Sequence, residues 1–295
     1  MPVIDWHIHT AYYESYAPGW RDFLIQQTGQ TPERLVELYG TPEKLLAFMD
    51  ESGVDYGVIL VEIAPITTGI VSNEYVAEFC RVSPRLIPFA CVNPYLVTHP
   101  ARELERLVVD LGFRGVKLYP TYNYFYPNEP MMYPLYAKAQ ELRVPVMAHT
   151  GSSVFPGARI KYGDPIFWDD VCVDFPDLVV VMAHCGRGFW YDRAQFLMRL
   201  HKNLYGDLAG LPPQNLLKYL PELERISRKV LFGTDFPGVP DVKKNLDVIR
   251  RLPLSDEAKE RILGGNAARL LGITQGLRTE PRGLRRTGDH LRTEN

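Results

Sequence analysis

The sequence predicts an α/β fold, a single-domain (β/α)8 TIM barrel with an inserted lid segment after the first strand. Eight short apolar runs rich in β-branched residues recur along the chain, and segments with helical periodicity separate them. This repeat leaves little chain over, whereas an open doubly wound sheet normally has about five to seven strands. A barrel uses about 250 residues as one unit, which suits a chain of 295 residues.

The predicted strands share an apolar composition and are bounded by turn residues. In chain order they are 3–9, 56–61, 86–92, 115–119, 144–149, 178–184, 204–208 and 229–235.

Predicted helices follow the strands. In the first, 41–52, Thr41 is a suitable N-cap and Pro42 occupies the first helical position. The others are 73–82, 100–111, 130–142, 165–175, 190–201, 213–225 and 241–251, with 255–263 and 266–271 closing the ring.

Two stretches fall outside the repeat. The insertion 11–40 follows strand one and carries several tyrosines and Trp20. In a barrel this connection lies at the C-terminal face, where loops build the pocket, and we predict that it forms a lid. From residue 275 the chain has many arginines and few apolar residues. We therefore predict a barrel domain over 1–274 and a disordered tail over 275–295.

Composition narrows the expected partners to a small-molecule substrate. The net charge is −2 and no basic stripe precedes the tail, which argues against nucleic acid. No apolar run of membrane-spanning length and no signal-like start occurs, so neither a membrane nor an export role is expected. The four cysteines form no C-x-x-C pair and suit a reducing cytoplasm. A homodimer is left open.

The end of strand one carries His7 and His9 in an H-x-H pattern. Successive strand side chains alternate between faces, so the two imidazoles face one way. Two nitrogen ligands on one face are half of a metal site, although two ordinary hydrogen-bonding histidines explain the pattern equally well.

Three further strand ends favour the metal site. His149 and His184 end strands five and six, and Asp235 ends strand eight. Parallel strands of a barrel present their carboxyl ends at one mouth, so these side chains are expected to converge with the H-x-H pair. Four of the seven histidines occupy equivalent strand ends, a coincidence that independent placement does not explain. The sequence therefore predicts a divalent metal site.

Five short motifs occur in order along the chain: DWHIHT at 5–10, GVKLYP at 115–120, AHTG at 148–151, AHCG at 183–186 and FGTDFP at 232–237. As a set they resemble the amidohydrolase superfamily, and within it the amidohydrolase-related group of aminocarboxymuconate-semialdehyde decarboxylase-like enzymes. The resemblance spans residues 1 to about 272.

The resemblance implies that His7, His9 and His149 bind one catalytic divalent ion, usually zinc (Zn2+), with manganese (Mn2+) as the alternative. It implies that Asp235 is a ligand or close neighbour of the metal and accepts the proton of its water. His184 would ligate the metal weakly or polarise the substrate carbonyl. A divalent ion lowers the pKa of bound water from 15.7 to about 7, which agrees with these roles.

The expected substrate contacts are Lys117, Tyr119, Arg187 and Trp190. In related enzymes with two metals, a carbamylated lysine at the position of Lys117 bridges the ions. With the single metal that we expect, Lys117 would pair with a substrate carboxylate or simply extend from the barrel mouth. An arginine among aromatic side chains suits a planar or cyclic carboxylic acid.

Three other polar side chains, Glu62, Asn93 and Asp207, stand at or just after predicted strand ends. We expect them to orient the substrate or the metal ligands rather than to act in catalysis.

These residues predict first a metal-dependent hydrolase, in which activated water attacks an amide, ester or lactone and Asp235 shuttles the proton. Non-oxidative decarboxylation of an aromatic or unsaturated acid uses the same ligands and is the alternative. A second alternative is a barrel that binds a ligand without turnover. The loops of nucleotide-binding proteins and the serine-hydrolase elbow have no counterpart in the sequence.

Overall fold

The computed structural model describes residues 1–10, 12 and 15–273. The predicted tail 275–295 lies outside the described residues, and so does a small part of the predicted lid.

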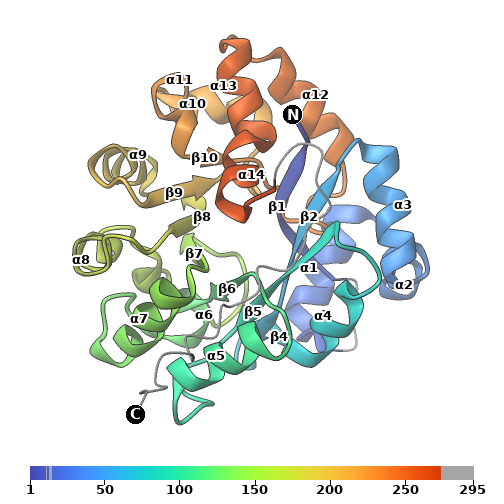
Figure 1. Ribbon diagram of the computed structural model, residues 1–295. Helices are drawn as coiled ribbons and strands as arrows, with labels where there is room; N and C mark the ends of the chain where they lie inside the picture. The colour runs from blue at the N-terminus through green and yellow to red at the C-terminus, as the bar shows by residue number, and fades with distance from the viewer. Residues whose placement is uncertain (11, 13–14, 274–295) are drawn as a thin grey trace, which may run out of the picture.

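Eight parallel strands form the predicted barrel in the order β1-β2-β5-β6-β7-β8-β9-β10 (Figure 1). Hydrogen bonds close the ring between the first and last segments, from Trp6 N to Phe232 O at 2.9 Å and from Asp235 N to His7 O at 3.0 Å. The strands are β1 Ile4–His9, β2 Tyr56–Leu60, β5 Leu86–Cys91, β6 Gly115–Leu118, β7 Val146–Gly151, β8 Val180–Arg187, β9 Leu204–Asp207 and β10 Val230–Leu231.

The last strand is shorter than predicted. Regular pairing of β10 with β9 ends at Leu231. The chain then continues along β1 through the closing hydrogen bonds, and Asp235 adopts a left-handed backbone with φ 71°. The predicted strand end is thus a turn beside β1.

Helices surround the barrel, as Figure 1 shows. The predicted helix over 213–225 is divided into two short helices because Pro221 lacks the amide hydrogen that would continue the first. The outer helices are α3 Pro42–Ser52, α4 Asn73–Cys80, α5 Pro100–Val109, α7 Tyr133–Leu142, α8 Phe167–Asp174, α9 Tyr191–Leu200, α10 Leu216–Tyr219, α11 Leu223–Ile226, α12 Val242–Arg251, α13 Asp256–Glu260 and α14 Asn266–Leu271.

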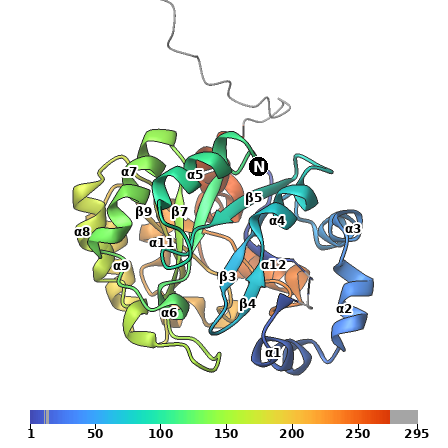
Figure 2. The same cartoon turned by 90° about the horizontal axis from the view of Figure 1, so that it is seen from below.

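The insertion is largely helical, with α1 over Pro18–Thr28 and α2 over Pro32–Tyr39. It contacts a short hairpin of β3 (Glu62–Ala64) and β4 (Gly69–Val71). Ala17, just before α1, donates its backbone N–H to the carbonyl of Thr68, in the hairpin turn, at 2.9 Å. Figure 2 shows α1, the hairpin and α6 (Pro120–Asn123) at the end of the barrel opposite the N-terminus. Additional structure therefore gathers where the carboxyl ends of the strands meet. Whether the insertion acts as a lid stays a prediction.

Apolar packing fills the opposite end of the barrel. Ile4, Trp6 and Phe89 are buried in one cluster with Ala267 and Leu271 of α14. A larger cluster lies between the strands and the outer helices. Since α14 packs against the barrel at this end (Figure 1), the pocket described below opens at the carboxyl ends of the strands.

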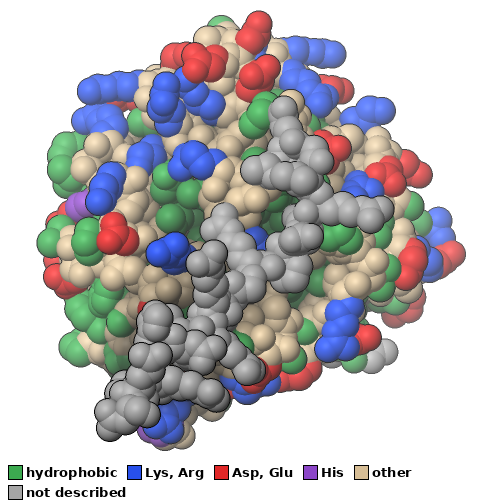
Figure 3. Space-filling view, viewed as in Figure 1, with side chains coloured by type: hydrophobic (Ala, Val, Ile, Leu, Met, Phe, Trp, Pro, Cys, Tyr) green, Lys and Arg blue, Asp and Glu red, His purple; other side chains and the backbone are tan. Residues whose placement is uncertain are grey.

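The molecular surface is mixed in charge. On the face of Figure 3, and outside the part that grey atoms cover, Lys and Arg side chains alternate with Asp and Glu around the rim. Among the described helices, none combines the length and apolarity needed to cross a membrane.

Candidate metal centre

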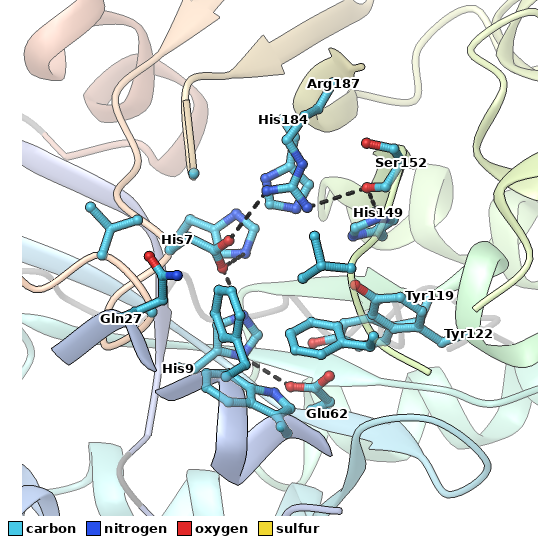
Figure 4. A pocket seen from close by; sticks show the side chains of 18 of the residues that line it. His7, His9, Gln27, Glu62, Tyr119, Tyr122, His149, Ser152, His184 and Arg187 are labelled. Carbon is cyan, nitrogen blue, oxygen red and sulfur yellow. Dashed lines mark hydrogen bonds and ion pairs between the residues drawn. The ribbon is translucent and has the colours of Figure 1, made fainter. Parts of the chain in front are cut away.

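The five predicted metal ligands lie in one pocket of about 290 Å³ at the carboxyl ends of the strands (Figure 4). His7 and His9 come from the end of β1, His149 from β7 and His184 from β8. Asp235 follows β10 in the turn beside β1. The convergence expected from parallel strand ends is therefore present.

His7, His9 and Asp235 form a compact group, with one ligand atom of each within 4.8 Å of the others. Asp235 Oδ1 lies 3.3 Å from His7 Nε2 and 3.4 Å from His9 Nε2. Behind the imidazoles, His7 Nδ1 is 3.0 Å from Asp207 Oδ2 and His9 Nδ1 is 3.2 Å from Glu62 Oε2. Asp207 and Glu62 thus lie on the Nδ1 sides of the two imidazoles, and both Nε2 atoms face Asp235, the side on which a divalent cation would bind.

A second group of His7, His184 and Asp207 is equally compact. Asp207 is already occupied, because its Oδ1 accepts from the backbone amides of His184 at 2.8 Å and Ala209 at 3.1 Å. The group of His7, His9 and Asp235 fits a metal better, because its ligand atoms face the pocket.

The other two histidines flank this group. The ring centroid of His184 lies 4.9 Å from that of His7 and 4.8 Å from that of His149. His184 Nδ1 donates to Ala209 O at 2.8 Å, which leaves its Nε2 as the acceptor. His149 Nε2 lies 3.3 Å from Ser152 O. His149 is thus adjacent to the compact group but outside it.

Burial and neighbouring cations keep most of the imidazoles neutral. Burial, and then Lys117, lower the pKa of His7. Burial, and then Arg187, hold the pKa values of His149 and His184 well below the ordinary value. Neutral imidazoles are the form that binds a cation.

The two remaining members of the group carry opposite charges. Burial alone would lower the pKa of His9, but hydrogen bonds to Asp235 and Glu62 raise it to about 9. Burial likewise opposes ionisation of Asp235, yet the surrounding imidazoles, His7 first, hold the pKa of Asp235 well below its usual range. An ionised carboxylate in a ring of imidazoles is a suitable proton acceptor.

Two cationic side chains border the group. Lys117 is fully buried, with its Nζ 3.4 Å from His7 Nε2, and burial lowers the pKa of Lys117 to about 8. Arg187 Nη1 lies 3.9 Å from Asp235 Oδ2, and its Nη2 donates to Ser152 O at 3.2 Å. Both line the pocket, and their contact with a substrate stays a prediction.

The other two predicted substrate contacts are placed differently. The ring of Tyr119 lines the pocket, but its hydroxyl donates to Val61 O at 2.8 Å and faces the backbone. Trp190 is not among the lining residues. It stands immediately before α9, with its ring centroid 5.7 Å from that of Phe189.

Sequence reasoning missed an aromatic wall. Trp20, Phe23 and Gln27 of α1 line the pocket at intervals of three and four residues, so they share one face of the helix. Trp20 stacks on Phe155 with ring centroids 5.6 Å apart. The helical spacing within the insertion was the available signal, but it does not say which face meets the pocket.

With this geometry in place, comparison with known proteins decides the family. The amidohydrolase family model matches residues 4–273. The chain belongs to the amidohydrolase family. This confirms the expected group, because relatives in it include an aminocarboxymuconate-semialdehyde decarboxylase.

Two curated relatives match this member of the family at low identity. A 2-keto-4-carboxy-3-hexenedioate hydratase of Sphingobium sp. is 26% identical over 243 residues, which cover 67% of this chain and 69% of the relative. A 2-amino-3-carboxymuconate-6-semialdehyde decarboxylase of Dictyostelium discoideum is 22% identical, with 68% of this chain and 65% of the relative covered. The matched part thus spans about two thirds of each relative.

Solved structures show the same barrel. An uncharacterised TIM-barrel protein of Bordetella bronchiseptica is 25% identical, with a TM-score of 0.76 and coverage of 92% of this chain and 99% of that one. A dihydroxybenzoic acid decarboxylase of Polaromonas sp., solved with manganese and 2-nitroresorcinol, is 20% identical, with a TM-score of 0.68 and coverage of 92% and 97%. These likenesses confirm the (β/α)8 fold.

Proposed function

We propose that this amidohydrolase-family enzyme is a metal-dependent, non-oxidative decarboxylase of a small hydroxylated aromatic or unsaturated carboxylic acid. The observation that carries the proposal is the group of His7, His9 and Asp235, bordered by a cationic guanidinium and an aromatic wall in one small pocket. Relatives named as decarboxylases support this reaction over the hydrolysis that the sequence favoured first.

The metal would be held by His7, His9 and Asp235, with His149 as the adjacent fourth ligand. The donor set of imidazole nitrogens and one carboxylate suits zinc or manganese, and the manganese in the Polaromonas relative supports the second ion. When bound, a divalent ion supplies Lewis acidity toward the oxygens of a chelating hydroxy acid. One metal per chain is proposed, because among the described residues one compact group of ligand atoms, that of His7, His9 and Asp235, faces the pocket.

The charge and size of the pocket suit a small monoanion. Asp235, Glu62 and Asp207 are carboxylates, whereas Lys117 and Arg187 are cations. Together with a divalent ion they leave one net positive charge when Lys117 is protonated. A cavity of about 290 Å³ lies at the lower end of ordinary ligand sites. A single ring with one carboxylate fits both features.

The side chains supply the proton transfers that the proposed decarboxylation needs. Asp235, held ionised, accepts the proton of the substrate hydroxyl and passes it to the carbon that bears the carboxylate. The bond between that carbon and the carboxylate breaks, its electron pair returns to the conjugated system, and carbon dioxide leaves. Water then reprotonates the substrate oxygen. Arg187 orients the carboxylate, and the rings of Trp20 and Phe155 exclude water from the developing charge.

Hydration is the second candidate function, because the relative at 26% identity is a hydratase. The same centre would add water across a carbon–carbon double bond of a keto acid, with Asp235 taking the proton of the water. Hydration retains carbon dioxide and changes the conjugation of the substrate, so the two reactions give different products.

The proposal is tested with the full-length protein loaded with Mn2+ or Zn2+. Hydroxybenzoic acids and unsaturated keto diacids are offered, and carbon dioxide release is measured together with loss of ultraviolet absorbance. We expect carbon dioxide in equal amount to the acid consumed, and a loss of at least 100-fold in Asp235→Asn. Loss of absorbance without carbon dioxide would support hydration instead. Bound acid with no turnover of any substrate would favour a barrel that only binds ligands.

A further inference from the structure

Glu62, the first residue of β3, has no place in the barrel repeat, yet it reaches the metal centre. Its Oε2 lies 3.2 Å from His9 Nδ1, while His9 Nε2 on the other side of the ring lies 3.4 Å from Asp235 (Figure 4). We propose that Glu62 is the positioning residue of His9. Its carboxylate faces the Nδ1 side of the ring, which favours the tautomer with the proton on Nδ1 and directs the Nε2 lone pair at the metal position. This inference rests on the metal binding within the proposed function.

Among the described residues, the ion-pair partner of Glu62 is His9. Glu62 is 1% exposed, and a buried carboxylate is costly unless it is paired. Within the part of the chain that the structure describes, no Lys or Arg forms an ion pair with Glu62. A carboxylate that served only the stability of the fold would be expected to have such a partner, or backbone amides like those bound by Asp207.

The backbone on one side of Glu62 is held by Tyr119. The Tyr119 hydroxyl donates to Val61 O at 2.8 Å. Both side chains are buried, and Tyr119 stands at the end of β6, two strands away from β2 in the barrel. The hydrogen bond thus ties the chain just before Glu62 to the rigid barrel wall.

The backbone on the other side is held by two amides. Asn123 Nδ2 donates to Ile63 O at 3.1 Å, and Asn93 Nδ2 donates to the same oxygen at 3.3 Å. Three side chains therefore fix the two carbonyl groups that flank Glu62. A three-residue strand outside the main sheet does not need this support to pair with β4. The support holds the carboxylate in place against His9.

Tyr119 consequently acts through Glu62. Its hydroxyl proton is engaged with Val61 O. We assign to Tyr119 the positioning of the Glu62 backbone, beside the predicted substrate contact of its ring, which stays a prediction.

The test is a double-mutant cycle on metal affinity. Dissociation constants for Zn2+ and Mn2+ are measured by chelator competition for the full-length wild type, Glu62→Leu, Tyr119→Phe and the double variant. Tyr136→Phe is the matched control, because the buried Tyr136 hydroxyl also donates to a backbone carbonyl at 2.8 Å, that of Pro127, outside the pocket. The melting temperature of each metal-free variant shows whether it folds.

Glu62→Leu is expected to weaken metal binding about 10-fold to 100-fold, the range for an outer partner of a ligating histidine. Tyr119→Phe is expected to weaken it about twofold to tenfold. The double variant should bind no more weakly than Glu62→Leu, because Tyr119 acts through Glu62. Glu62→Gln, which keeps an acceptor without the charge, should fall between wild type and Glu62→Leu.

Two results would overturn the role of Glu62 alone: a metal affinity of Glu62→Leu and Glu62→Gln within twofold of wild type, or additive losses in the double variant. Equal losses in Tyr119→Phe and Tyr136→Phe would remove the part assigned to Tyr119. A wild-type chain that binds neither ion would overturn the proposed metal centre together with this inference.

Discussion

Replacing Asp207 by asparagine separates two roles of this buried carboxylate: accepting from two backbone amides and setting the tautomer of His7. Asp207 Oδ1 accepts from the backbone amides of His184 and Ala209, and Oδ2 faces His7 Nδ1 at 3.0 Å. The asparagine keeps a carbonyl oxygen for the two amides but turns an NH2 group toward His7. Because that group donates, His7 must accept at Nδ1 and carry its proton on Nε2, where the metal would bind.

The expected magnitudes differ for the two tasks. Asp207→Asn should lower metal affinity about 10-fold to 100-fold and leave the free energy of unfolding of the metal-free protein nearly unchanged, since both backbone hydrogen bonds remain. Asp207→Ala leaves three buried donors without a partner, at about 1–3 kcal/mol each. A total of about 3–9 kcal/mol is a large part of the stability of about 5–15 kcal/mol that is typical of a folded protein.

Urea unfolding of the metal-free variants and chelator competition with Zn2+ measure the two effects separately. Asp169→Asn is the control, because Asp169 also pairs with a histidine, His201 Nε2 at 2.6 Å, but on a side of the barrel away from the pocket. Its metal affinity should equal that of wild type. Wild-type affinity in Asp207→Asn would refute the tautomer argument, and an unfolding free energy as low as that of Asp207→Ala would refute the separation of tasks.

Three other predictions follow from the geometry. In Gly210→Ala, the added Cβ would lie 2.6 Å from Arg187 Nη1, so the displaced guanidinium should lower turnover about 100-fold. Because the backbone φ at Gly210 is +66°, the free energy of unfolding should also fall by about 1–2 kcal/mol. Turnover at the wild-type rate would contradict the crowding of Arg187. Gln27→Leu should raise KM about twofold to tenfold by removing an amide that lines the pocket. Gln26→Leu, next to it on α1 but not among the lining residues, should leave KM unchanged; equal KM values would exclude Gln27 from binding. Burial, and then the charge of a nearby arginine, lower the pKa of Lys229 to about 8, so the unfolded chain binds more protons between pH 8 and about 10.4. The wild type should therefore gain stability relative to Lys229→Gln as pH rises through that window, and parallel urea-unfolding profiles would contradict the shift.

The elements that the sequence predicted well are those that depend on neighbouring residues in the chain. Each strand is an apolar run bounded by turn residues, and the parallel arrangement brings all carboxyl ends to one mouth. The convergence of His7, His9, His149 and His184 could therefore be predicted from the sequence. The order of the strands in the sheet follows the order in the chain.

The parts that escaped prediction depend on tertiary context. The strands β3 and β4 have three residues each, too short for a periodic pattern. The pocket face of α1 is decided by the contact of the insertion with the hairpin. Trp190 follows a predicted ligand strand by only a few residues, yet Arg187 lines the pocket and Trp190 does not. Proximity in sequence to a strand end does not decide which way a loop turns.

Backbone strain at the metal centre gives Asp207 a larger structural role than its position at the end of a strand indicates. His184 and Asp235 adopt left-handed conformations, with φ 68° and 71°, which cost about 1–2 kcal/mol each for residues with a side chain. The amide of Asp235 is held by His7 O at 3.0 Å, and the amide of His184 is held by Asp207 Oδ1 at 2.8 Å. Asp207 thus stabilises the strained backbone of one histidine and the tautomer of another. Both strained residues point polar side chains into the same pocket. We therefore infer that their left-handed backbone conformations serve the site rather than the stability of the fold.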